Sequence, residues 1–211
     1  MNIILVGPPG SGKGTQAFSI KDKYQLDHIS TGDLFRDAIK NQTELGKQVS
    51  SILEKGELVS DELTLSIVEE AISKVTKKGY LLDGYPRTVR QAELLDELNT
   101  EIDAVIYFKI DTELLIERLT GRRICKSCGA SYHIIFNAPI KEGVCNECGG
   151  ELYQRNDDNV ESAQTRLNEF FDKTLPLIDY YKNQGKLFEV DASLEMSMVT
   201  SNIDAIFEEV K

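Results

Sequence analysis

Positive charge is scarce in this chain. The 24 Lys and Arg residues stand against 35 Asp and Glu residues, which gives a formal net charge of −11 and an isoelectric point near 4.8. Nucleic-acid-binding proteins usually carry a basic domain or stripe, so this balance argues against nucleic acid as the main partner. A small anionic substrate is compatible with it, because a local cluster of arginines can reverse the electric field inside one cleft.

Long apolar runs are also missing. The N-terminal segment MNIILVGPPG has no basic leader, and its apolar run ends at Val6, unlike a secretory signal peptide. No stretch approaches the length that is needed to cross a bilayer. We therefore expect a cytoplasmic protein that does not associate with membranes.

Cysteine is absent outside one segment, which contains CKSC and CNEC in the spacing C-x2-C-x16-C-x2-C at Cys125, Cys128, Cys145 and Cys148. In a reducing compartment this spacing favours a metal site, with two disulfides or idle thiols as the alternative. Four thiolates complete a tetrahedron and leave no position for water, so we expect structural Zn²⁺. His133 lies within the segment, and we interpret it as an ordinary residue rather than a ligand.

Apolar runs that suit buried strands alternate with amphipathic stretches along most of the chain. The strand candidates are 2–6, 80–83, 104–110, 187–190 and, more weakly, 28–30. The helical candidates are the segment with Ala17, Ile20 and Tyr24 at helical spacing, followed by 60–76, 88–98, 112–119, 159–183 and 194–210. This alternation predicts an α/β fold with a doubly wound, parallel, five-stranded sheet.

Two segments interrupt the alternation. Residues 31–59 predict two short helices with no strand between them, and residues 121–158 hold the cysteines with little helical periodicity. We expect both to be insertions at the carboxyl edge of the sheet, where such folds bind ligands. The predicted division is a core of residues 1–29, 60–120 and 159–211, a first insertion of residues 30–59, and a second of residues 121–158.

The stretch GPPGSGKGT, residues 7–15, is typical of a phosphate-binding loop between a strand and a helix. Its glycines let the backbone aim N–H groups inward, the helix that follows adds its positive end, and Lys13 reaches the outer phosphates. The usual pattern has a hydroxyl directly after the lysine, whereas here Gly14 follows and the hydroxyl comes at Thr15. An ordinary Gly/Pro turn is the alternative, but the position of the stretch between a strand and a helix favours a phosphate-binding loop.

Two further motifs carry candidate ligands. In STGD, Ser30 is followed three residues later by Asp33, a helix-start signature, and Arg36 lies one turn on. A helix N-terminus beside an arginine suits a monophosphate, although a capped helix with a solvated arginine is the alternative. Asp83 ends an apolar run before Gly84, which indicates either an acid facing the phosphate loop or only a turn.

Arginines flank the cysteine segment on both sides, in a chain that is acidic overall. They are Arg118, Arg122, Arg123, Arg155 and Arg166. Phosphoryl transfer needs charge neutralisation and in-line positioning more than covalent help, so such a cluster suits it. Solvation at the surface is the alternative for any one of them.

Together these motifs resemble those of adenylate kinases and their nucleoside monophosphate kinase relatives. The matching blocks are GPPGSGKGTQ, HISTGDLFR, KGELV, LLDGYPRT with Gln91, ERLTGRR, YQRNDDN and Arg166, in family order. The resemblance implies the reaction MgATP + AMP ⇌ 2 ADP in a monomer with an AMP-binding insertion and a zinc-containing lid. The phosphate-binding loop of this family itself reads G-K-G-T, so Gly14 is a feature of the family rather than a departure from a working loop. The resemblance also implies that Asp83 orients water around Mg²⁺.

The resemblance also implies site residues. For ATP they are Gly10, Ser11, Gly12, Lys13, Gly14, Thr15, Arg118, Arg122, Ser131, Tyr132 and Leu194. For AMP they are Thr31, Arg36, Glu57, Leu58, Val59, Gly84, Tyr85, Pro86, Arg87, Gln91, Arg155 and Arg166. For catalysis they are Lys13, Asp83, Arg87, Arg122, Arg155 and Arg166, with Asp157 and Asp158 fixing the arginines when the lid is closed. Arg123 has the weakest assignment.

Other interpretations stay open. A kinase that uses GTP as donor or a different monophosphate as acceptor is the nearest one. A zinc-ribbon module for nucleic acid is another, although basic and aromatic residues are not interleaved around the cysteines. A regulatory nucleotide-binding protein is the third. The chain departs from the common family pattern at Ser60, where proline is frequent, and at Ala192, where glycine is frequent.

Overall fold

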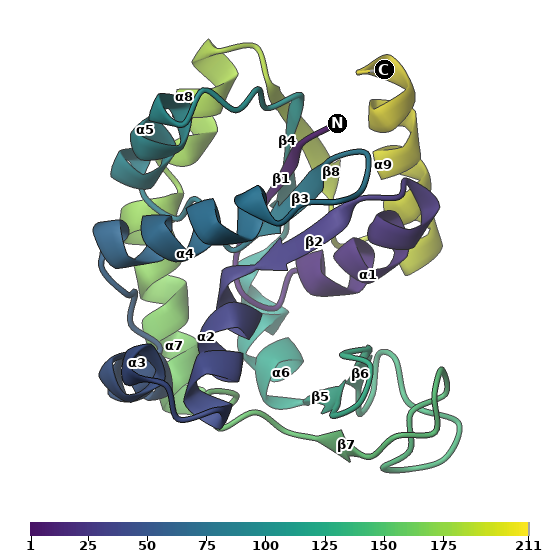
Figure 1. Ribbon diagram of the computed structural model, residues 1–211. Coiled ribbons are helices and arrows are strands. Elements are labelled where there is room, and N and C mark those ends of the chain that lie inside the picture. The colour runs from purple at the N-terminus through teal and green to yellow at the C-terminus, as the bar shows by residue number, and fades with distance from the viewer. Residues whose placement is uncertain (211) are drawn as a thin grey trace.

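The computed structural model describes residues 1–210, and its centre is a five-stranded sheet (Figure 1). Its strands are β1 (Ile3–Val6), β2 (Asp27–Ser30), β3 (Tyr80–Asp83), β4 (Ala104–Lys109) and β8 (Leu187–Asp191). They lie in the order β2-β3-β1-β4-β8, and every neighbouring pair is parallel. The predicted doubly wound parallel sheet is therefore confirmed, including the weakly predicted strand at residues 28–30.

Helices cover both faces of this sheet. One face carries α1 (Lys13–Lys23) and α9 (Met196–Glu209), and the other carries α4 (Asp61–Ser73), α5 (Val89–Glu97) and α8 (Leu177–Asn183) (Figure 1). Side chains alternate along a strand, so Ile3 and Leu5 of β1 pack in the first core, and Ile4 and Val6 pack in the second. A strand buried on both faces has to be apolar throughout, which explains the run IILV.

The first predicted insertion folds as two helices, α2 (Thr31–Lys40) and α3 (Glu44–Lys55), with no strand between them. Ser30 and Thr43 cap these helices, because their hydroxyls accept hydrogen bonds from the backbone N–H groups of Asp33 and Gly46. Phe35 and Val49 form the centre of a small core of their own. The helices lie beside the carboxyl end of the sheet (Figure 1).

The second insertion contains a small antiparallel sheet that the sequence did not predict. Its strands are β5 (Arg122–Cys125), β6 (Ser131–His133) and β7 (Leu152–Tyr153), in the order β6-β5-β7. It follows a 3₁₀ turn (Thr112–Leu114) and α6 (Leu115–Thr120), which together replace the single helix expected over residues 112–119. In Figure 1 this sheet lies away from the main sheet, at the end of α6.

The stretch 159–183, expected to be one amphipathic helical stretch, is divided into two helices. Helix α7 (Val160–Glu169) runs into a π turn (Phe170–Thr174), and α8 begins at Leu177. The backbone N–H of Leu175 donates to the carbonyl of Phe170 over 2.8 Å, and Pro176 has no N–H with which to continue the ladder. The π turn also has a tertiary contact, because Thr174 Oγ1 donates to the carbonyl of Arg87 over 2.8 Å.

Candidate functional site

A cleft of about 720 Å³ lies at the carboxyl edge of the main sheet, between the phosphate loop, α2 and the small sheet. Most of the predicted ligands line it. They are Gly10, Ser11, Gly12, Lys13, Gly14, Thr15, Arg36, Leu58, Asp83, Gly84, Pro86, Arg87, Arg118, Arg122, Ser131, Tyr132, Arg155, Arg166 and Leu194. Residues that are far apart in the sequence thus share one cavity.

The phosphate loop connects β1 to α1. Gly10 and Gly12 have φ angles of 85° and 92°, a left-handed conformation that glycine adopts without strain. Lys13 Nζ donates to the loop carbonyls of Gly7 and Pro8 over 2.6 and 2.9 Å. Burial lowers the pKa of Lys13 to about 8. The ammonium group is therefore held inside the loop, at the point where phosphates would enter.

Asp83 ends β3 and faces the start of α1. Burial raises the pKa of its carboxyl group, but the His28 ring and the charge of Lys13 outweigh this effect and bring it to about 2. His28 Nε2 lies 3.7 Å from Asp83 Oδ2. Sequence reasoning missed His28, although its place on β2, beside the strand that ends in Asp83, could have indicated it.

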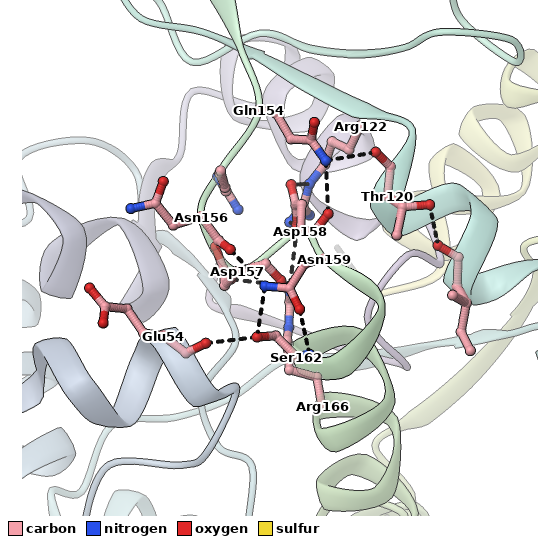
Figure 2. Close-up of polar contacts among 12 residues, drawn as sticks. Glu54, Thr120, Arg122, Gln154, Asn156, Asp157, Asp158, Asn159, Ser162 and Arg166 are labelled. Carbon is pink, nitrogen blue, oxygen red and sulfur yellow. Dashed lines mark hydrogen bonds and ion pairs between the residues drawn. The ribbon is translucent and has the colours of Figure 1, made fainter.

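Two of the predicted catalytic arginines, Arg122 and Arg166, are hydrogen-bonded to the buried carboxylate of Asp158 (Figure 2). The side chain of Asp158 is fully buried and accepts two hydrogen bonds from Arg122, the one from Nε over 2.9 Å. Arg166 Nη1 donates to Asp158 over 3.3 Å and to Asp157 over 3.1 Å. Burial and the neighbouring charge of Arg122 lower the pKa of Arg166 to about 10. The two aspartates thus pair with two of the predicted catalytic arginines, Arg122 and Arg166.

A second carboxylate connects the two insertions. Asp33 Oδ1 on α2 lies 2.6 Å from Arg36 Nη2 and 3.4 Å from Arg155 Nη2, which follows β7. Burial and the nearby charge of Arg36 lower the pKa of Arg155 to about 10. Arg155 thus lies in a crowded positive environment, and a negative phosphate would stabilise its charged form.

A smaller cavity of about 60 Å³ is lined by several of the residues predicted to bind AMP, namely Thr31, Glu57, Leu58, Val59, Gly84, Arg87, Gln91 and Arg166. Gln91 is held at both ends of its amide, since Oε1 accepts from the Arg87 backbone over 2.7 Å and Nε2 donates to Asp61 over 2.9 Å, and within residues 1–210 its second N–H is left free to donate. Tyr85 lies outside this cavity, because its side chain is fully buried in the core and its hydroxyl donates to the Gln91 carbonyl. Any role of Tyr85 in nucleotide binding thus falls to its backbone.

The donor end has a cation and an aromatic ring. The Arg118 guanidinium lies 5.6 Å from the centre of the Phe136 ring and donates to the Ala192 carbonyl over 3.4 Å. Sequence reasoning missed Phe136, because nothing in the sequence showed that this loop residue would lie opposite Arg118. Arg123 is outside both cavities and donates to the carbonyl of Arg122 over 2.8 Å.

The four cysteine sulfurs lie within 4.8 Å of one another, and all four are free thiols. Cys125 and Cys148 are 3.5 Å apart, and Cys128 and Cys145 are 3.6 Å apart. A tetrahedral zinc centre with Zn–S bonds of about 2.3 Å has S···S edges of roughly 3.8 Å, so this arrangement fits a metal better than disulfide bonds, whose sulfurs lie about 2.0 Å apart. His133 is outside the cluster, and its Nδ1 accepts the backbone N–H of Ile135 over 3.0 Å.

Comparison with known proteins gives one consistent result. The family described as "Adenylate kinase" matches residues 5–186. The chain belongs to the adenylate kinase family. It is 52% identical over 208 residues to "Adenylate kinase" of Desulforamulus reducens, which covers 96% of this chain and 98% of the relative. It is also 52% identical to the Bacillus pumilus protein of that name, with 96% of both chains covered, and to that of Staphylococcus aureus, with 99% of both covered.

No helix within residues 1–210 is both long enough and apolar enough to span a bilayer.

Proposed function

We propose that this adenylate kinase family member catalyses MgATP + AMP ⇌ 2 ADP. The observation that carries the proposal is one cleft with a phosphate loop at one end and, at the other, a second helix N-terminus beside Arg36. Arg87, Arg122 and Arg166 lie between these ends. A cleft with two anion sites separated by cations suits transfer between two nucleotides.

The residues act by neutralising and aligning phosphates. Lys13 exchanges its two loop carbonyls for the donor phosphates. Asp157 and Asp158 hold Arg122 and Arg166 in place, and these arginines neutralise the charge that develops on the moving phosphoryl group. Thr31, Arg36 and Arg87 hold the acceptor phosphate, while Gln91 and the backbone of 57–59 contact its base. Ser11, Gly12 and Thr15 contact the donor phosphates, and Arg118 stacks on the donor base.

The cysteine segment acts as a lid over this cleft. Residues 121–158 supply Arg122 and Arg155, residues 30–59 receive AMP, and the remaining residues form the core. A site left open to water would transfer the phosphoryl group to water instead of AMP. Because lid arginines complete the site only on closure, hydrolysis is suppressed.

Two metals belong to this proposal. Asp83 would hold the hydration shell of Mg²⁺, which would accompany ATP and supply positive charge beside its phosphates. Structural Zn²⁺ is held by the four cysteines, whose spacing fits it, and substitutes for the core that a small lid cannot build. Protein purified without chelator should contain one Zn²⁺ per chain, and its removal should lower the melting temperature. Finding no zinc by elemental analysis would refute this site.

We further propose a cytoplasmic monomer whose partners are nucleotides, without nucleic acid or membrane partners. The acidic net charge supports the exclusion of nucleic acid.

A coupled assay for ADP formation from ATP and AMP tests the proposal. A panel with GTP as donor and UMP or CMP as acceptor tests specificity, and faster turnover with any of these would change the assignment. Lys13→Ala should abolish most transfer, and Arg87→Ala or Arg122→Ala should lower kcat on the order of a thousandfold. Arg90→Ala, an exposed arginine on α5, is the matched control. Unchanged kcat in all three site variants would overturn the mechanism.

A further inference from the structure

Tyr132 lies between the nucleotide cleft and the cysteine cluster. It stands on β6, its side chain is buried, and it packs in the core of the small sheet with Cys125, Cys145 and Leu152. The same residue lines the large cleft. Its predicted role in ATP binding gives no reason for the position of its hydroxyl group.

That hydroxyl group makes two hydrogen bonds in the CNEC turn. The backbone N–H of Asn146 donates to Tyr132 Oη over 2.8 Å. Tyr132 Oη lies 3.3 Å from Cys145 Sγ. The oxygen accepts from Asn146, and its own proton is free to point at the sulfur. Because a metal-bound cysteine is a thiolate that can only accept, Tyr132 would donate to Cys145 in the metal site.

Backbone N–H groups also donate to the four sulfurs, namely those of Ser127, Cys128, Ala130, Glu147, Cys148 and Gly150. Ser127 N–H donates to Cys125 Sγ over 3.4 Å. Apart from the cysteines themselves, Tyr132 is the only residue within 1–210 whose side chain is hydrogen-bonded to one of these sulfurs. Four thiolates around a divalent cation carry a net charge of −2, and a buried excess charge is costly unless hydrogen bonds compensate it. Tyr132 therefore adds a side-chain donor to the backbone donors in this balance, and it is the one that a substitution can remove.

We propose that Tyr132 is a positioning residue of the four-cysteine metal centre. Its hydroxyl donates to the Cys145 thiolate and holds the CNEC turn through Asn146, which orients one ligand and offsets part of the thiolate charge. Groups that hydrogen-bond to metal ligands commonly change metal affinity by 10- to 100-fold when they are removed. This inference rests on the proposed zinc site, and it assigns to it a residue outside the cysteine pattern.

The test compares Tyr132→Phe with wild type and with Tyr153→Phe. Phenylalanine keeps the ring and removes only the hydroxyl group. Tyr153 lies on β7 of the same sheet, is partly exposed, and makes no hydrogen bond to a cysteine among the described residues. Zinc affinity is measured on the full chain by competition with a chromogenic chelator of known affinity. Tyr132→Phe should raise the zinc dissociation constant roughly tenfold or more, and Tyr153→Phe should leave it within about twofold.

A spectroscopic measurement separates this role from a loss of packing. With Co²⁺ in place of Zn²⁺, the thiolate-to-metal charge-transfer band should move to lower energy in Tyr132→Phe, because the sulfur loses a donor that stabilised its lone pairs. Equal zinc affinity and an unmoved band would overturn the proposal for Tyr132 while leaving the metal site intact. A wild-type chain that binds neither metal would instead refute the site itself, and this inference with it.

Discussion

Replacing Asp158 with asparagine tests the buried arginine cluster most directly. The change keeps the shape of the side chain but removes the charge that pairs with Arg122 and Arg166. The carboxylate is fully buried, and each of the two arginine side chains is 18% exposed. Breaking a buried ion pair typically costs about 3–5 kcal/mol, and the partial exposure of the arginines moves this site to the lower end, about 3 kcal/mol.

For a domain of this length, each kcal/mol lowers the melting temperature by about 2–4 °C, so Asp158→Asn should melt about 6–12 °C below wild type. Differential scanning calorimetry without nucleotide measures this. Asp172→Asn is the control, because Asp172 is exposed and makes no ion pair among the described residues. In the double variant Asp158→Asn with Arg122→Gln, the loss of unfolding free energy should be smaller than the sum of the two single losses by about 1–3 kcal/mol, since the two residues contact each other. A melting temperature within about 1 °C of wild type would refute the reasoning.

Two further predictions concern the phosphate loop and Asp83. A Cβ atom on Gly14 would lie 3.7 Å from Asp83 Oδ2, which is an ordinary contact, so the Gly14→Ala protein should melt at or above the wild-type temperature. It should nevertheless need about tenfold more Mg²⁺ for half-maximal rate, because the added methyl group would occupy space beside Asp83 that the hydration shell of a bound Mg²⁺ would use. Ser19→Ala, on the same helix, is the control. If Gly14→Ala needed no more Mg²⁺ than wild type, the proposed place of the Mg²⁺ hydration shell beside Asp83 would be wrong. Because the Asp83 pKa falls from 3.8 to about 2 on folding, its stabilising effect is complete above pH 3.8 and is lost as the pH falls toward 2. In urea unfolding, the stability difference between wild type and Asp83→Asn should therefore shrink by about 1 kcal/mol between pH 5 and pH 3, and a constant difference would exclude this role.

The parts that the sequence predicted are those whose signals are local. An apolar run before a glycine-rich turn can only be buried, so β1, the loop and α1 were predicted correctly. The C-x2-C pairs likewise specify the cluster of four sulfurs without knowledge of the fold. The motif order also led correctly to the adenylate kinase family.

The parts that escaped prediction depend on tertiary contacts. Strand β7 has only two residues, and it pairs with β5 in a sheet whose core includes the cysteines rather than a long apolar run. The break before α8 had a local signal in Pro176, but the π turn also depends on the contact between Thr174 and Arg87. The Tyr132–Cys145 hydrogen bond joins residues that no spacing rule connects.

The charge distribution explains why an acidic protein can hold polyanions. Asp33, Asp157 and Asp158 form ion pairs with Arg122, Arg155 and Arg166, so acidic residues and the cationic cleft lie side by side in a chain of net charge −11. This pairing is incomplete, because burial and like charge still lower the pKa values of Arg155 and Arg166 to about 10. Phosphates in the cleft would favour the charged forms and so raise these values. Phosphate binding and the charged forms of Arg155 and Arg166 therefore favour each other.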